Sequence, residues 1–157
     1  MPGVASTDET TVPLAELYEL DFHGWCLRVA ELLANGKTGE LDTGHLREEI
    51  ESLAGRDERE VISRMKRILQ HLLKLQYQPG KRSRSWQATL ANQRGELAAL
   101  LEQSPSLAGV AERGVGRAYK LARRLAVIET GLPTEIFPQE CEYSLQQILD
   151  PDLNPRA

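Results

Sequence analysis

The stretch from Val61 to Trp86 reads VISRMKRILQHLLKLQYQPGKRSRSW, and it decides the fold class. At 100° per residue, its apolar residues fall on one arc of a helix, and a polar, basic arc adjoins it. The apolar arc holds Val61, Met65, Ile68, Leu69, Leu72 and Leu75, and the polar arc holds Glu60, Arg64, Arg67, His71 and Lys74. Pro79-Gly80 ends the run. The pattern therefore predicts a helix from about Arg56 to Tyr77.

Capping and stop residues delimit the other helices on both sides of this stretch. The expected helices run from Pro13 to Asn35-Gly36, from Asp42 or Thr43 to Gly55, from Ser83 or Ser85 to Ser104-Pro105, and from Ser106 to Gly131-Leu132-Pro133. A Ser144-x-x-Gln147 capping box opens a short last helix. The sequence thus predicts an all-α fold, an antiparallel helical bundle of about five main helices with a short C-terminal helix.

Length and composition indicate one soluble domain. The chain has 157 residues, of which 41% are apolar and 27% charged, as is ordinary for a globular protein. We expect residues 1–12 to form a disordered tail and residues 13–157 a single all-helical domain. The longest apolar run, Leu97 to Leu101, is far short of the ~20 residues of a membrane span. With no secretory signal and only Cys26 and Cys141, we expect a cytoplasmic protein with reduced thiols.

Charge is distributed unevenly along the chain. Residues 61–95 carry eight basic and no acidic residue, whereas the rest of the chain carries 11 basic and 23 acidic ones. A basic block of this kind binds an anionic partner, or acidic residues of the same molecule neutralise it.

The first candidate site is an anion or nucleic-acid surface built on this block. The corner after Pro79-Gly80 is basic and lies at the start of a helix, where unpaired backbone N–H groups attract anions. The candidate residues are Arg64, Arg67, His71, Lys74, Lys81, Arg82, Arg84 and Trp86. Against this function, Glu48, Glu49 and Glu51 offer partners for the basic stripe, and Trp86 also fits a core position. Nucleic-acid binding is therefore possible but not favoured.

The second candidate is a metal or acid–base site. Asp21, Glu49 and His71 each lie beside apolar positions on a different expected helix, and helical bundles build metal sites from such residues. The sharper Glu-x-x-His pair is missing, and a histidine at a core edge is more often only hydrogen-bonded. No standard catalytic or cofactor motif is present, so no cofactor is expected.

Four ordered blocks of the sequence resemble a known family. They are YELDFHGW at 18–25, EEIESLAGRDERE at 48–60, HLLKLQYQPGKRSRSW at 71–86, and ETGLP at 129–133 with FPQECEYSLQQILD at 137–150. These blocks are similar to the bacterial domain-of-unknown-function 29 family over nearly the whole chain. The resemblance implies a small, all-helical protein and transfers no catalytic residue. His23-Gly24 departs from the family pattern, which places a more helix-favouring pair between Phe22 and Trp25.

These observations favour a binding or protein-interaction module over an enzyme. We expect a protein partner or self-association through an apolar patch that buries ~1,000 Å² or more. The alternatives that stay open are nucleic-acid or phosphate binding through residues 61–95, and a metal-dependent enzyme that uses Asp21, Glu49 and His71.

Overall fold

The computed structural model describes residues 12–155, so most of the expected N-terminal tail lies outside the described residues. The chain divides into two compact units, with the boundary between Ala54 and Gly55. We refer to residues 12–54 as unit 1 and to residues 55–155 as unit 2, and describe each by itself. The single domain expected over residues 13–157 stays a prediction, because two compact units can still fold cooperatively.

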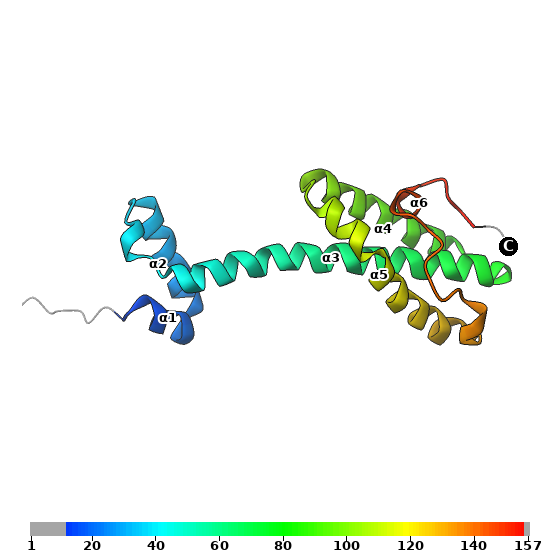
Figure 1. Ribbon diagram of the computed structural model, residues 1–157, viewed down its shortest axis with the longest axis horizontal. Helices are drawn as coiled ribbons and strands as arrows, with labels where there is room; N and C mark the ends of the chain where they lie inside the picture. The colour runs from blue at the N-terminus through cyan, green and yellow to red at the C-terminus, as the bar shows by residue number, and fades with distance from the viewer. Residues whose placement is uncertain (1–11, 156–157) are drawn as a thin grey trace, which may run out of the picture. The chain divides into compact units, whose positions relative to one another are not determined.

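The all-α fold is confirmed: residues 12–155 contain helices and no strand (Figure 1). The helices are α1 (Leu14–Leu20), α2 (Phe22–Ala34), α3 (Thr43–Tyr77), α4 (Arg84–Gln103), α5 (Leu107–Thr130) and α6 (Leu145–Leu149). Short 3-10 turns lie at Thr38–Glu40, Pro79–Lys81 and Thr134–Ile136. Local signals set several ends as expected. Ser83 caps α4, Ser144 and Gln147 form the capping box of α6, and Gly131 ends α5 at φ 69°.

The expected first helix is in fact two helices. Asp21 leaves the helical conformation at φ −150° and ψ 84°, and its Oδ1 accepts a hydrogen bond of 2.9 Å from the backbone N–H of Gly24. A Cβ at Gly24 would lie 2.6 Å from Asp21 Oδ2. Glycine at position 24 therefore leaves room for the Asp21 carboxylate that caps α2, although glycine normally weakens a helix.

The expected stop at Gly55 is also wrong, because α3 runs unbroken from Thr43 to Tyr77. Glycine ends a helix when it takes a positive φ. Within the described residues, only Gly36 and Gly131 do so. The charged residues that follow Gly55 favour helix, so its cost of ~1 kcal/mol relative to alanine is tolerated.

Unit 2 holds the main hydrophobic core. Residues 55–77 of α3 contribute its largest share, α4 turns back along them, and α5 packs against both (Figure 1). The buried core residues include Met65, Ile68, Leu69, Leu72 and Leu75 of α3, Leu90 and Leu97 of α4, and Ala111, Ala118, Ala122 and Ala126 of α5. The alanines on α5 keep its side chains short where it meets the leucine-rich face of α3, which lets the helices approach closely.

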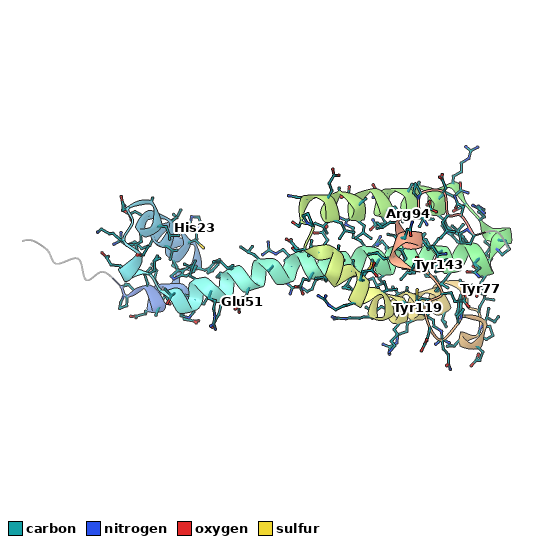
Figure 2. The ribbon with its side chains drawn as sticks, turned by 45° about the horizontal axis from the view of Figure 1, so that its top comes forward. His23, Glu51, Tyr77, Arg94, Tyr119 and Tyr143 are labelled. Atoms are coloured by element: carbon teal, nitrogen blue, oxygen red, sulfur yellow. The ribbon has the colours of Figure 1, made fainter. Side chains whose placement is uncertain are left out.

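Polar side chains fasten the C-terminal segment to the unit 2 helices (Figure 2). Buried Arg94 donates from Nε to the carbonyl of Ile148 at 2.9 Å and from Nη1 to that of Leu153 at 3.0 Å. The hydroxyl of Tyr119 donates to the carbonyl of Pro138 at 2.7 Å. Because these bonds satisfy carbonyls of an irregular segment, Arg94 acts as a structural cation.

Two glycines of α5 differ sharply in their surroundings. A Cβ at Gly114 would overlap Cδ1 of Ile62 and lie 3.3 Å from Cε of Met65, whereas a Cβ at Gly116 would meet nothing within 4 Å. Gly116→Ala should raise the free energy of unfolding by about 0.5–1 kcal/mol, because alanine favours helix. Gly114→Ala should gain nothing, since displacing Ile62 offsets that preference. Thermal denaturation of both variants measures the difference, and equal stabilisation would contradict the close packing at Gly114.

Candidate functional site

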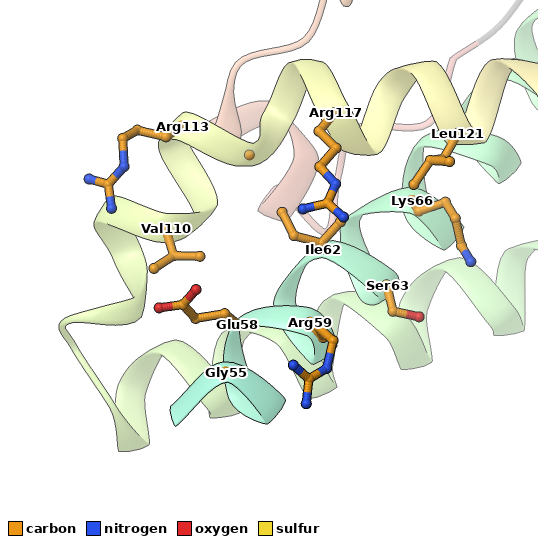
Figure 3. Close-up of a pocket in the computed structure, with 11 residues that line it drawn as sticks. Gly55, Glu58, Arg59, Ile62, Ser63, Lys66, Val110, Arg113, Arg117 and Leu121 are labelled. Atoms are coloured by element: carbon orange, nitrogen blue, oxygen red, sulfur yellow. The ribbon is translucent and has the colours of Figure 1, made fainter. Parts of the chain in front are cut away.

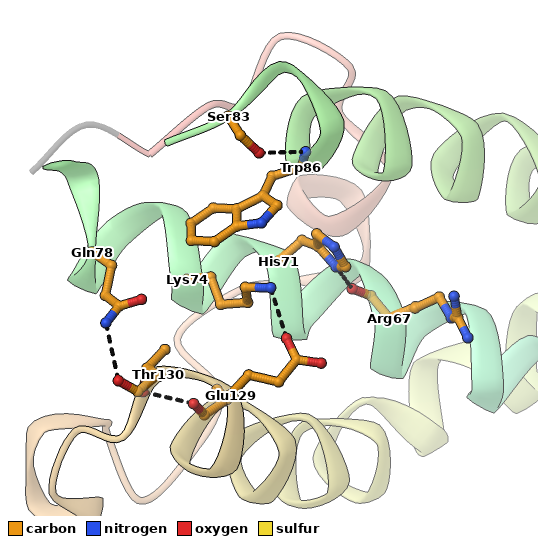
Figure 4. A network of polar contacts seen from close by, with 9 residues as sticks. Arg67, His71, Lys74, Gln78, Ser83, Trp86, Glu129 and Thr130 are labelled. Atoms are coloured by element: carbon orange, nitrogen blue, oxygen red, sulfur yellow. Dashed lines mark hydrogen bonds and ion pairs between the residues drawn. The ribbon is translucent and has the colours of Figure 1, made fainter. Parts of the chain in front are cut away.

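Lys74, an expected anion ligand, is a structural residue of unit 2. Its side chain is 10% exposed, and its Nζ donates to Glu129 Oε2 on α5 at 2.7 Å (Figure 4). The same Nζ lies 4.2 Å from the ring centroid of Trp86 on α4, a cation–π contact. The Lys74 ammonium holds the pKa of Glu129 below its usual range. Lys74 thus joins three helices and has little surface left for an outside anion.

Other candidate cations of the basic block also have partners inside unit 2. Arg64 pairs with Glu60 at 2.7 Å and with Glu96 at 3.6 Å. Arg82 donates to the Asn154 side chain at 3.0 Å. The neutralising carboxylates are therefore Glu60, Glu96 and Glu129, instead of the expected glutamates at 48, 49 and 51.

Three candidate cations remain exposed without an ion pair among residues 12–155: Arg67, Lys81 and Arg84. Trp86 is partly buried against the core, so its ring is not a free stacking surface. Nucleic-acid binding through residues 61–95 stays a prediction and now rests on these three side chains.

Each member of the expected metal trio has a local partner. Asp21 caps α2, Glu49 Oε1 accepts a hydrogen bond of 2.6 Å from the Tyr18 hydroxyl, and His71 Nδ1 lies 2.9 Å from the carbonyl of Arg67. Glu49 and His71 stand on the same helix, α3, and not on the two helices that the hypothesis assumed. Burial lowers the pKa of His71. No group of three or more His, Cys, Asp or Glu side chains within residues 12–155 is arranged to hold a metal ion.

An aromatic cluster organises unit 1. Trp25 is 2% exposed, and its ring centroid lies 5.1 Å from that of Tyr18 and 5.8 Å from that of Phe22. The His45 ring stacks on Tyr18 at 4.0 Å. Trp25 Nε1 is buried without a hydrogen bond of normal geometry. The hydrogen bond from His45 lowers the pKa of Asp42 most, and the Trp25 indole makes a smaller contribution in the same direction.

The pair of His45 and Asp42 gives unit 1 a pH dependence. His45 Nδ1 lies 2.6 Å from Asp42 Oδ2, and this hydrogen bond raises the pKa of His45 and lowers that of Asp42. The raised pKa of His45 means that the hydrogen bond stabilises folded unit 1 fully at pH values below about 6.5, the pKa of histidine in an unfolded chain. This stabilisation is lost as pH rises through the pKa of His45 in the folded state. Stabilisation through the lowered aspartate pKa is present above about 3.9 and is lost as pH falls through the folded value.

We therefore expect unit 1 to be most protected between about pH 4 and 6.5 and to open more often at higher pH. Amide hydrogen exchange of residues 22–34, corrected for its intrinsic pH dependence, measures this opening. In His45→Gln, the protection of residues 22–34 should no longer fall as pH rises above about 6.5. The measurement must be local, because the lowered pKa of His71 works in the opposite direction in unit 2. If His45→Gln lost protection with rising pH as the unmodified protein does, the pH dependence would not come from the His45–Asp42 pair.

Unit 1 exposes many of its large apolar side chains. Seven of them are exposed by 40% to 70%: Val12, Leu20, Phe22, Leu27, Leu33, Ile50 and Leu53. Only Trp25, Val29 and Leu32 of this unit are buried. A unit with this many exposed apolar side chains is a candidate interaction site, because large exposed apolar areas mark such sites in soluble proteins. We call these seven side chains the apolar surface of unit 1.

Unit 2 carries a groove between α3 and α5 with a volume of about 680 Å³ (Figure 3). Four basic side chains line it: Arg59 and Lys66 from α3, and Arg113 and Arg117 from α5. Its apolar lining comes from Ile62, Val110 and Leu121, and Glu58 is its one acidic lining residue in the described chain. None of the four cations forms an ion pair within residues 12–155. We call this feature the basic groove.

Comparison with known proteins identifies the family of this chain. A family model described as domain of unknown function DUF29 matches residues 17–154. The chain belongs to the DUF29 family. No curated protein and no solved structure matches this DUF29 chain. Within its described residues, no helix is long and apolar enough to cross a membrane.

Sequence reasoning missed both surfaces of this DUF29 chain, although one left a signal. Arg113, Arg117, Lys120 and Arg124 recur at spacings of four, three and four, which places them on one face of α5. That periodicity predicts a second basic stripe outside residues 61–95. The apolar surface of unit 1 left no such signal, because Ile50 and Leu53 have the same spacing whether a partner covers them or not.

Proposed function

We propose that the chain is a protein-interaction module that binds a second copy of itself through the apolar surface of unit 1. The observation that carries the proposal is the ratio of exposed to buried side chains in this unit, seven large apolar ones exposed against three buried. A folded unit normally hides most of its large apolar side chains, and very small units often rely on a disulfide, a metal or oligomerisation for stability.

Neither covalent nor metal support is present in unit 1 as described. Both cysteines of the chain are free. Among residues 12–155, no metal-binding group of side chains exists. Association with a second chain would bury the apolar surface, and symmetric pairs of identical chains are the commonest oligomers of soluble proteins. The two free thiols also support the cytoplasm as the compartment that we propose, because its reductants keep thiols unpaired.

A single substitution with a matched control tests the proposal. Ile50 is 58% exposed in unit 1, and Ile128 is 76% exposed in unit 2. Ile50→Ser should weaken self-association about tenfold or more, because burial of one isoleucine side chain contributes ~1.5–3 kcal/mol. Ile128→Ser makes the same chemical change outside the apolar surface and should leave self-association unchanged.

Sedimentation equilibrium of both variants at several concentrations gives the dimer dissociation constants. An Ile50→Ser protein with the unmodified dissociation constant would refute the apolar surface as the interface. Equal weakening by Ile128→Ser would show that general surface hydrophobicity, and not unit 1, drives the association.

A further inference from the structure

The basic groove has the chemistry of a docking site for an acidic, apolar protein surface. Its lining combines cations with apolar side chains, and a cleft between two helices is a common site for a partner helix. Among residues 12–155, no aromatic side chain lines the groove, so this part of the chain offers no stacking platform there for the bases of a nucleic acid. The apolar lining from Ile62 and Leu121 instead matches a partner that presents apolar side chains beside carboxylates.

Unit 1 is such a surface. Residues 12–54 carry nine acidic and three basic residues, a net charge of −6. All three basic residues are already paired inside the unit: Arg28 with Glu31 at 2.6 Å, Lys37 with Glu40 at 3.7 Å, and Arg47 with Glu51 at 3.5 Å. Within residues 12–54, acidic side chains therefore outnumber the cations that could pair with them, and the same unit carries the apolar surface.

Several of these carboxylates gather at one place in unit 1. Glu49 binds the Tyr18 hydroxyl, and the charges of Glu48 and Glu19 also act on that hydroxyl. Together with the hydrogen bond to Glu49, which contributes most, they raise the pKa of Tyr18 to about 12. Leu20 and Ile50, two members of the apolar surface, directly follow Glu19 and Glu49 in sequence. Unit 1 thus carries carboxylates and exposed apolar side chains on the same two helices, α1 and α3.

We propose that unit 1 of one copy docks in the basic groove of unit 2 of a second copy. This inference rests on the proposed self-association and names the surface that receives unit 1. Direct pairing of two unit 1 surfaces would bring two net charges of −6 together, whereas the basic groove is complementary in charge. If each copy docks into the other, the two contacts are equivalent and close the assembly as a dimer. Each contact then needs to bury only about half of a standard ~1,600 Å² interface.

Charge reversal on each side tests the pairing. The groove variant Arg113→Glu with Arg117→Glu changes two exposed side chains that have no ion pair in the described chain. It should raise the dimer dissociation constant about 100-fold or more, because like charges then face each other in both contacts. The unit 1 variant Glu19→Lys with Glu48→Lys should weaken the dimer in the same way.

Mixing the two weakened variants should restore a dimer. In the mixed pair, the two lysines introduced on unit 1 of one chain meet the two glutamates introduced in the groove of the other. The remaining contact keeps its original charges. The matched control is Lys81→Glu with Arg84→Glu, which makes the same net charge change at exposed positions outside the groove and should stay dimeric. Sedimentation velocity of each variant alone and of the mixture measures all of these outcomes, and circular dichroism verifies folding.

Each result decides between the two proposals. If the groove variant dimerises normally while Ile50→Ser does not, the groove assignment is wrong and the proposed function stands. Failure of the mixture to dimerise, with both variants folded, also overturns the groove assignment. If the unmodified chain is monomeric, both proposals fail. If charge reversal in the groove lowers the melting temperature, the milder variant Arg113→Gln with Arg117→Gln replaces it. This variant should still weaken the dimer. A normal dimer in this variant would overturn the assignment of the groove as the docking site.

Discussion

Trp25→Ala should unfold unit 1 and leave unit 2 folded. Trp25 is 2% exposed, and its ring contacts those of Tyr18 and Phe22. Removing a buried tryptophan costs about 3–5 kcal/mol through lost burial and an unfilled cavity. A unit with three buried apolar side chains has no second core to absorb that loss. Unit 2 retains its own large core of α3, α4 and α5 residues, which the substitution does not touch.

Amide hydrogen exchange of the full-length chain separates these effects. Residues 22–34 of α2 should lose their protection in Trp25→Ala, whereas the core positions of α4 and α5 should keep theirs. Self-association should disappear at the same time, because the apolar surface no longer has a folded support. Trp25→Phe is the matched control, since it retains an aromatic ring and removes the unpaired indole N–H. Equal loss of α2 protection in both variants would contradict the role of ring packing.

The second large effect is expected at Lys74. Lys74→Glu places a carboxylate in a site where the side chain is 10% exposed, opposite Glu129 and against the Trp86 ring. An unpaired charge in such a site is strongly destabilising, and we expect the free energy of unfolding to fall by about 3 kcal/mol. Adding Glu129→Lys should recover part of the loss, because the ion pair is then restored with its charges exchanged.

Lys81→Glu supplies the control for this prediction. Lys81 is exposed after the Pro79-Gly80 turn, so the same charge change should alter stability by no more than about 0.5 kcal/mol. Urea denaturation of the three variants measures the differences. If Lys74→Glu were as mild as Lys81→Glu, Lys74 would not be the structural residue that its contacts indicate.

Local sequence signals predicted much of the fold. Pro79-Gly80, Ser83 and the Ser144 capping box act through neighbouring backbone groups, so they set helix ends regardless of the rest of the molecule. Asp21 and Gly55 were misread because their roles depend on conformation. Gly55 stays in the helical region and continues α3, while Asp21 takes an extended φ and starts α2.

The candidate binding surfaces were less predictable, because the contacts that define them join residues far apart in the sequence. The basic block in residues 61–95 is visible in the sequence, but the carboxylate that neutralises Lys74 lies 55 residues away at Glu129. Periodicity shows which face of a helix is apolar, and it does not show whether that face is covered. Leu72 is fully buried and Ile50 is 58% exposed, although both belong to apolar stripes of α3. Only three-dimensional packing separates core from interaction surface.

The central claim is that the apolar surface of unit 1 is covered by a second copy of the chain. Light scattering of the unmodified protein after size separation, over a wide range of concentration, tests it most directly. The account predicts a molar mass that reaches twice the 17.5 kDa of one chain as concentration rises. A mass of 17.5 kDa at every concentration would contradict it.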